Sequence, residues 1–454
     1  MSNKSFTRVT AAAAATIALA GCQSGGDQDG SGRADGWSAV FRSAVISPYE
    51  QIKLNEPRGF ADQTVRQALH LAAGGDQVRV RLTNRYGRAP LTIGAARVAL
   101  RKAEDEIVAE TDTALRFGGA ERVTVPAGGE VVSDPVSLTV AKGGDLALSL
   151  YLPASTGLAT YSHMPRQDAY VVSGNRASAA ALPMAERVPF RFFVTGVDVR
   201  GAGDGPVAVA FGDSWFEGVG TTPGANHRSV DYLNGRLPRG WVVNQGIAGN
   251  RLTRGEIGES GLARFDRDVL AVLGVSRVLL NFGINDLILG GMAGQPPATA
   301  QQLIDGFTEL ARRARAAGLT VHAATVGPYA GCVFPGMPIA ESLPIRRQVN
   351  DWLRHTDVFD SVFDVAAAVE DPARPGYIRP EFDSGDGMHL NDAGARAMAE
   401  TGVDTRFPVR APPLLTARGP ASIVDRCAHG CGPVCMQCIG QRERLKHSGM
   451  PGVR

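Results

Sequence analysis

The body of this sequence contains almost no cysteine. Of the six cysteines in 454 residues, Cys22 lies near the start, Cys332 lies in the middle, and the other four fall between positions 427 and 438. Domains built on disulfides distribute their cysteines throughout the fold. We therefore expect a hydrophobic core to hold this protein together. The composition, with 44% apolar and 20% charged residues, is typical of a globular protein.

Two other features are missing, and each excludes a class of protein. No apolar run approaches the roughly 20 residues that a membrane-spanning helix needs. The body also lacks the clustered basic residues of a nucleic-acid-binding surface. The formal net charge is +2, but from Thr405 onward eight Lys and Arg residues accompany only two acidic residues, so the preceding part is slightly acidic. We expect no nucleic-acid partner.

The first 36 residues have the pattern of an export signal followed by a tether. Two basic residues precede an apolar run over 9–20, which is too short to cross a bilayer but typical of a signal peptide. The run ends in Leu19-Ala20-Gly21-Cys22, which resembles a bacterial lipobox. The resemblance implies that Cys22 is acylated and becomes the first residue after cleavage. The alternative is an ordinary cleaved signal or an uncleaved anchor in which Cys22 is incidental.

These features predict the start of the protein and its location. We expect residues 1–22 to be a lipoprotein signal peptide and the Gly/Ser/Asp-rich residues 23–36 to be a flexible tether. The protein is then exported and lies outside the cytoplasmic membrane of a bacterium. It contacts the membrane only through its lipid anchor.

Residues 37–200 have the pattern of an all-β domain. Val78, Val80 and Leu82 alternate with polar residues, and leucines alternate in the same way over 146–152. Clusters of Gly, Pro and Asp separate such runs, as turns do. We expect a β-sandwich or jelly roll whose last strand covers 191–199.

Residues 206–404 change to short apolar runs that alternate with amphipathic helices. One helix is predicted over 303–314 and is terminated by Gly318. This alternation predicts an α/β fold with a mostly parallel sheet covered by helices on both faces. The expected strands are 207–211, 241–244, 277–282, 319–326 and 362–365. In such sheets the active site lies at the carboxyl ends of the strands.

Four polar motifs follow these runs: Gly212-Asp213-Ser214-Trp215, the loop 245–250, Gly283-Ile284-Asn285-Asp286, and the segment 383–389 that ends in Asp386-Gly387-Met388-His389. Together they resemble the consensus blocks of the SGNH (GDSL-like) hydrolase superfamily: GDS, a loop glycine, GxND and DxxH. The resemblance covers 206–404 and implies a flavodoxin-like, three-layer domain. The preceding β domain and lipoprotein signal are similar to a bacterial branch of that superfamily.

The chemistry of acyl transfer explains these residue types. A serine hydroxyl is a poor nucleophile and requires an adjacent base. His389 can accept the proton of Ser214 if a carboxylate orients its other ring nitrogen, and Asp386 is three residues away. Asp383 is the rival for this role. The resemblance further implies an oxyanion hole made by the backbone N–H of Ser214, the N–H of Gly249 and the side chain of Asn285. Gly246, in the same loop as Gly249, is an alternative donor.

The sequence thus predicts an exported serine esterase that hydrolyses carboxylic esters, with short acyl groups on carbohydrate or cell-envelope molecules as substrates. No cofactor and no metal are expected. Two alternatives stay open. One is a lipase-like, lysophospholipase-like or acyltransferase activity at the same site, and the other is an inert glycan-binding envelope protein. The absence of a GxSxG motif argues against the α/β-hydrolase fold.

The tail, residues 405–454, departs from the family pattern. It is rich in Arg, Pro and Cys and has no apolar periodicity, so we expect it to be disordered. A zinc site is the alternative, but the C-x3-C-x3-C-x2-C spacing is not that of a standard zinc knuckle. Its candidate ligands are Cys427, His429, Cys431, Cys435 and Cys438.

Overall fold

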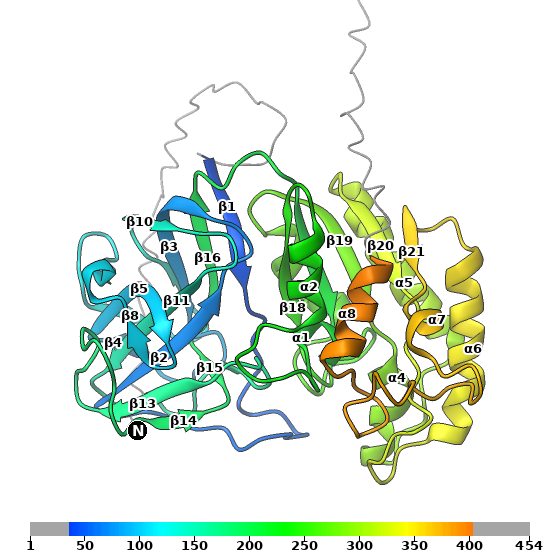
Figure 1. Cartoon of the computed structure of the whole chain (residues 1–454). Coiled ribbons are helices and arrows are strands. Elements are labelled where there is room, and N and C mark those ends of the chain that lie inside the picture. The colour runs from blue at the N-terminus through cyan, green and yellow to red at the C-terminus, as the bar shows by residue number, and fades with distance from the viewer. Residues whose placement is uncertain (1–35, 403–454) are drawn as a thin grey trace, which may run out of the picture. The chain divides into compact units, whose positions relative to one another are not determined.

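A computed structural model describes residues 36–402 of the chain (Figure 1). The predicted signal peptide, the tether, Cys22 and the predicted tail, including its possible zinc ligands, lie outside the described residues. Within residues 36–402, none of the helices combines the length and the apolar character needed to span a membrane. We refer to residues 37–200 as the β domain and to residues 206–402 as the α/β domain.

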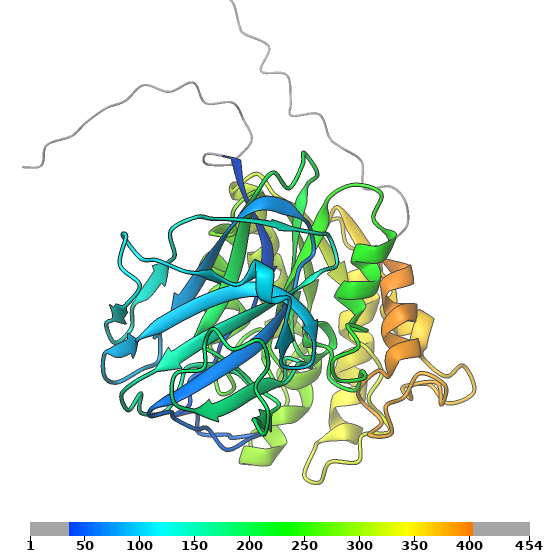
Figure 2. The ribbon, with the colours of Figure 1, turned by 60° about the vertical axis from the view of Figure 1, so that its left-hand side comes forward.

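The β domain consists of antiparallel sheets, as the alternating pattern predicts. One sheet contains, in order, β1 (Trp37–Arg42), β16 (Val194–Arg200), β3 (Gly75–Thr83) and β10 (Val136–Val140), and β9 (Glu130–Val132) also pairs with β3. The other contains, in order, β14 (Glu186–Val188), β13 (Ala169–Ser173), β2 (Gln63–His70), β11 (Asp145–Leu152), β5 (Ala95–Ala103) and β6 (Glu106–Ile107), with β7 (Thr113–Ala114) also on β5. These strands come forward in Figure 2.

Three short elements complete the β domain. They are the strand pair β4 (Leu91–Ile93) and β8 (Val123–Val125), the pair β12 (Tyr161–Ser162) and β15 (Arg191–Phe192), and the 3-10 turn η2 (Ala109–Thr111).

Side chains that alternate along the strands form the core of the β domain. Val78, Val80 and Leu82 of β3 are fully buried between partly exposed arginines. The last predicted strand is interrupted. Phe193 has a positive φ of 58° and separates β15 from β16. The apolar pattern over 191–199 could not reveal this break, because Phe193 is itself buried like its neighbours.

The α/β domain contains a parallel five-stranded sheet in the order β18-β17-β19-β20-β21. This confirms the predicted three-layer, flavodoxin-like fold. The strands are β17 (Val207–Gly212), β18 (Trp241–Gly246), β19 (Val275–Asn281), β20 (Thr320–Ala324) and β21 (Ser361–Phe363). Every residue of β17 is buried, because β17 lies inside the sheet and is covered on both faces.

Two groups of helices pack on this sheet. In one group, α2 (Ser229–Arg236) and α7 (Val365–Val369) contact α8 (Asp392–Thr401). In the other, α3 (Gly261–Phe265) and α6 (Ile339–His355) contact α5 (Ala300–Ala316). Shorter turns are α1 (Ser214–Glu217), the π-helical η3 (Asp266–Leu270), α4 (Ile284–Ile288) and η4 (Leu289–Ala293).

The end of the last predicted strand is wrong by two residues. The apolar run suggested a strand over 362–365, but β21 ends at Phe363. The side chain of Asp364 accepts a hydrogen bond from the N–H of Ala367 and thereby begins α7. Val365 is therefore the first residue of a helix.

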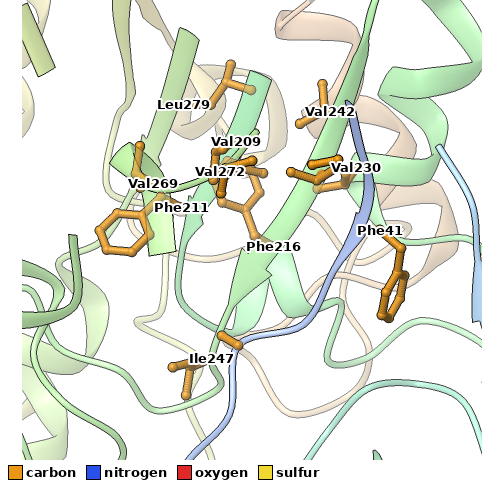
Figure 3. Close-up of a cluster of buried hydrophobic side chains, with 14 of the residues drawn as sticks. Phe41, Val209, Phe211, Phe216, Val230, Val242, Ile247, Val269, Val272 and Leu279 are labelled. Carbon is orange, nitrogen blue, oxygen red and sulfur yellow. The ribbon is translucent and has the colours of Figure 1, made fainter. Parts of the chain in front are cut away.

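Strand β1 of the β domain packs against β18 of the α/β domain (Figure 3). The indole of Trp241 donates a hydrogen bond to the carbonyl oxygen of Ala39 over 2.6 Å. Phe41 on β1 and Val242 on β18 belong to one buried cluster that continues to Val209 and Phe211 on β17. The core beneath the carboxyl ends of β17 and β18 is thus continuous with that of the β domain.

Candidate active site

The sharp turn after β17 places Ser214 at the carboxyl end of an interior strand. Asp213 caps α1, because its side chain accepts a hydrogen bond from the N–H of Trp215 over 3.1 Å. Ser214 is consequently the first helical residue and is 3% exposed. No described residue accepts a hydrogen bond from its backbone N–H. Burial of Asp213 raises its pKa to about 7, and the nearby Asp286 carboxylate adds to this effect.

A chain of two hydrogen bonds links Ser214 to the loop before α8. The Nε2 atom of His389 lies 3.0 Å from Oγ of Ser214, and its Nδ1 atom lies 2.7 Å from Oδ2 of Asp386. In the tautomer whose Nδ1–H donates a hydrogen bond to Asp386, Nε2 is left as an acceptor for the serine proton. Ser214 and Asp386, which are 172 positions apart in sequence, are thereby linked through one imidazole ring.

The carboxylate of Asp386 is held in its charged form by several donors. Burial alone would raise its pKa, but the hydrogen bond from His389 and the backbone N–H groups of Met388 and His389 lower it well below the usual range. Both backbone bonds reach Oδ1, over 3.0 and 2.8 Å. This leaves Oδ2 for the imidazole alone.

Asp383, the rival acid, has a different set of contacts. Its Oδ1 atom accepts hydrogen bonds from the N–H groups of Gly385 and Gly387 over 2.8 and 3.0 Å. These bonds close the turn that carries Asp386. The structure therefore brings Asp386, and not Asp383, to the ring of His389.

Trp215 fixes the loop that carries the histidine. Its ring is buried, and its Nε1 donates a hydrogen bond to the carbonyl oxygen of Met388 over 3.0 Å. On the other side of His389, the side chain of Asn391 caps α8 by accepting a hydrogen bond from the N–H of Gly394. The serine and the histidine are thus linked by a second contact that does not involve their own side chains.

Asn285 reaches the site from the first turn of α4. Its Nδ2 atom donates to the carbonyl oxygen of Asn250 over 3.1 Å and lies 3.5 Å from Oδ2 of Asp213. The second distance exceeds the usual range for such a bond, so one N–H remains available to an incoming anion. Asp286, the next residue, accepts hydrogen bonds from the N–H groups of Leu252 and Thr253. It thereby holds the segment that directly follows the 245–250 loop.

The two candidate loop glycines differ in what occupies their N–H groups. The N–H of Gly246 donates to Oδ1 of Asn244 over 2.9 Å, and a Cβ atom at Gly246 would collide with the backbone of Glu217. Gly249 has a positive φ of 77°, and its N–H has no hydrogen-bond partner among the described residues. Close packing therefore explains why position 246 is a glycine, whereas Gly249 has an N–H that is available as a donor to the oxyanion.

Sequence reasoning missed a buried arginine beneath the site. Arg264 is 0% exposed and donates to the carbonyl oxygens of Gly212, the last residue of β17, and Gln245, the last but one of β18. Its Nε atom also donates to Oδ1 of Asn250, and Asp268 neutralises its charge. One side chain thus joins both strand ends to the oxyanion loop, which we define as residues 247–250. Its position in α3 carries no sequence signal, because arginines in helices are usually exposed.

The arrangement is suited to nucleophilic acyl transfer. It combines a serine hydroxyl, an imidazole within hydrogen-bonding distance and a carboxylate that orients the imidazole. Two N–H groups and one amide have the free donor capacity that an oxyanion needs. Within residues 36–402, no group of three His, Cys, Asp or Glu side chains is placed to hold a metal ion. These features define the class of protein: a hydrolase-type α/β domain with a serine–histidine–aspartate site.

Comparison with known proteins identifies this class more closely. Residues 210–397 match the model of the GDSL-like lipase/acylhydrolase family, which confirms the resemblance predicted for the α/β domain. No curated protein matches the chain.

Several solved structures are similar to the chain. One is a carbohydrate acetylesterase from Sinorhizobium meliloti, with 14% identity, a TM-score of 0.36, and coverage of 44% of this chain and 97% of that one. Another is the aryl esterase of M. smegmatis, with 16% identity, a TM-score of 0.35, and coverage of 43% and 95%. A third is a carbohydrate esterase family 2 enzyme with a carbohydrate binding domain from Corynascus thermopiles (Myceliophthora fergusii). It has 12% identity, a TM-score of 0.35, and coverage of 80% and 96%.

Proposed function

We propose that the protein is a serine ester hydrolase in which Ser214 is the nucleophile, His389 the general base and acid, and Asp386 the orienting acid. The observation that carries this proposal is the chain of hydrogen bonds from Ser214 Oγ through His389 to Asp386, with distances of 3.0 and 2.7 Å. An inert protein would have no need to keep these three groups aligned.

The reaction takes place in two halves. Oγ of Ser214 attacks the acyl carbon while its proton passes to Nε2 of His389, and the resulting oxyanion is stabilised by the N–H groups of Ser214 and Gly249 and by Asn285. The imidazolium then protonates the leaving alcohol, and an acyl-serine remains. In the second half, water gives a proton to Nε2 and attacks the acyl carbon. The imidazolium then returns a proton to Oγ as the bond to Ser214 breaks, which releases the carboxylic acid and restores the serine hydroxyl.

The substrates we propose are esters of short acyl groups on carbohydrate or cell-envelope molecules. The lipobox-like motif and the β domain packed against the α/β domain favour such a substrate at the cell surface. The test is a panel of p-nitrophenyl esters from two to sixteen carbons, assayed with protein that lacks residues 1–22. Highest kcat/KM for the two-carbon ester supports the proposal. A maximum for long chains favours the lipase-like alternative, and acyl transfer to an added alcohol at the expense of hydrolysis favours an acyltransferase.

Removal of the Asn285 amide is expected to lower kcat by about 100-fold to 1,000-fold while KM changes little, because an oxyanion donor acts mainly in the transition state. Steady-state kinetics of Asn285→Ala check this. Asn234 is a matched control, since it is also buried in the α/β domain but binds only the backbone of Val242. Asn234→Ala is expected to lower the melting temperature and to leave kcat unchanged. Equal kcat in wild type and Asn285→Ala would contradict the assigned role.

We also propose that Cys22 anchors the protein to the outer face of the cytoplasmic membrane. Two acyl chains on one residue give stable membrane attachment. The wild-type protein is expected to sediment with membranes after expression in a bacterial host, and Cys22→Ser is expected to remain without lipid. Mass spectrometry of the mature N-terminus decides the point. An unmodified N-terminus at another residue of the wild-type protein would refute the anchor.

A further inference from the structure

Glu217 is a buried carboxylate one helical turn after Ser214. It is 6% exposed and takes no part in the reaction steps described above. Buried carboxylates are costly unless each oxygen has hydrogen-bond donors. Both oxygens of Glu217 have them, and the donors come from two different parts of the chain.

The first oxygen of Glu217 faces the β domain. Oε1 accepts a hydrogen bond from the hydroxyl of Ser162 over 2.9 Å and from the N–H of Met164 over 3.3 Å. Ser162 belongs to β12, so this contact joins the last residue of α1 to the β domain.

The second oxygen faces the oxyanion loop. Oε2 accepts a hydrogen bond from the N–H of Ala248 over 2.5 Å. Ala248 is buried and directly precedes Gly249, whose free N–H we assigned to the oxyanion. The N–H of Ala248 lies in the peptide plane between Ile247 and Ala248, and only the two backbone torsions of Ala248 separate this plane from the next one, which carries the N–H of Gly249.

Building on the proposed function, we infer that Glu217 is a positioning residue for the oxyanion hole. It clamps the 247–250 loop between α1 and the β domain, and so aims the N–H of Gly249 at the site in front of Ser214. It does not touch the substrate. The inference also gives the β domain a role in catalysis, since Ser162 and Met164 fix the carboxylate from the other side.

The chemistry of the clamp requires a carboxylate. Three donors and no acceptors point at it, and an ionised carboxylate accepts hydrogen bonds only. The guanidinium groups of Arg191 and Arg228 lie close enough to attract its negative charge. A glutamine in this position would direct its NH2 group at one of the donors and would lose that contact.

Other contacts support the far end of the same segment without reaching Gly249. Oε1 of Glu50 accepts a hydrogen bond from Gly258 over 3.3 Å, and the hydroxyl of Tyr86 donates to Glu259 over 3.3 Å. Both partners lie eight or more residues after Ala248. Glu217 is therefore the contact from which a direct effect on the oxyanion donor is expected.

The first arm of the test measures the loop and needs no activity. Hydrogen–deuterium exchange of wild-type protein and Glu217→Gln is followed in peptides that cover residues 246–250. We expect the Ala248 amide to exchange at least about tenfold faster in the variant, because its weakened hydrogen bond to residue 217 can open without unfolding of the surrounding structure. Unchanged exchange at Ala248 would overturn the clamp. If the wild-type protein has no esterase activity, the proposed function is wrong, but the exchange measurement still tests whether Glu217 holds the oxyanion loop.

The second arm measures the oxyanion hole. Glu217→Gln is expected to lower kcat for p-nitrophenyl acetate by about 10-fold to 100-fold with KM within twofold, which is less than full loss of a donor. The affinity for a trifluoromethyl ketone, whose adduct with Ser214 bears an oxyanion, is expected to fall by the same factor as kcat/KM. Ser162→Ala removes one of three donors and is expected to have a smaller effect in the same direction.

A matched variant separates positioning from stability. Asp231 is a largely buried carboxylate that pairs with Arg228 near Glu217 but has no bond to the oxyanion loop. Asp231→Asn is expected to lower the melting temperature while kcat and the ketone affinity stay at wild-type values. If Glu217→Gln shows this same pattern, Glu217 is only structural and the inference is wrong.

Discussion

Substitution of Ser214 by alanine is expected to lower kcat for ester hydrolysis by about six orders of magnitude, which leaves at most the residual rate due to binding and the oxyanion hole. Among residues 36–402, the hydroxyl of Ser214 is the only hydrogen-bond partner of His389 Nε2, at 3.0 Å, so none of the other described nucleophiles shares this base. The measurement is steady-state hydrolysis of p-nitrophenyl acetate, with covalent labelling by a fluorophosphonate as a second readout. Both signals are expected to disappear.

A serine close to His389 in sequence, Ser384, serves as the control for Ser214. Ser384 lies on the loop of His389 and is exposed, and only its backbone bonds to His389. Ser384→Ala is expected to keep full labelling and activity. Fluorophosphonate labelling that persists in Ser214→Ala, or that disappears in Ser384→Ala, would mean that the nucleophile has been assigned to the wrong residue.

The parts of the site that the sequence predicts well share one physical cause. A parallel sheet buries its strands on both faces, so each strand appears as a short apolar run, and the carboxyl ends of these runs converge in space. Polar motifs directly after such runs must therefore meet. Ser214 and Asn285 could be placed together for this reason. The segment that ends in His389 follows α7 and a loop rather than a strand, so its place came from the resemblance to the DxxH block, and Asp386 could be preferred to Asp383 by its shorter reach.

The supporting residues could not be predicted, because their partners are distant in sequence and their types are uninformative. Arg264 and Glu217 look like ordinary surface charges of a helix. Only the fold shows that one binds the ends of β17 and β18 and that the other binds Ser162 of the β domain. The choice between Gly246 and Gly249 likewise depended on which N–H already had a partner, and spacing carries no such information.

The same support explains how a short turn can hold an oxyanion site. Residues 247–250 have no regular structure, but buried polar side chains bind them from three directions. Arg264 holds Asn250 from below, Glu217 holds Ala248, and Asn285 holds the carbonyl oxygen of Asn250. Such a network keeps donors in place before the substrate arrives, which is the condition for effective electrostatic stabilisation.

Substitution of Asp386 by asparagine is expected to lower kcat by about four orders of magnitude with little loss of stability. The two backbone N–H groups on Oδ1 would hold the amide oxygen of the new side chain in place, so its NH2 group would face Nδ1 of His389. Nδ1 must then accept a hydrogen bond, and the ring proton moves to Nε2. In this tautomer Nε2 cannot take the proton of Ser214.

Asp383→Asn is the matched control for this tautomer effect, because an amide oxygen can still accept the hydrogen bonds from Gly385 and Gly387. Its kcat is expected to stay within about tenfold of wild type, since the turn is kept and His389 is untouched. Steady-state kinetics of both variants, with melting temperatures to confirm folding, compare the two carboxylates directly. A larger loss for Asp383→Asn than for Asp386→Asn would show that the orienting acid is misassigned. Nearly full activity in both would mean that the histidine is oriented by some group other than a carboxylate of this loop.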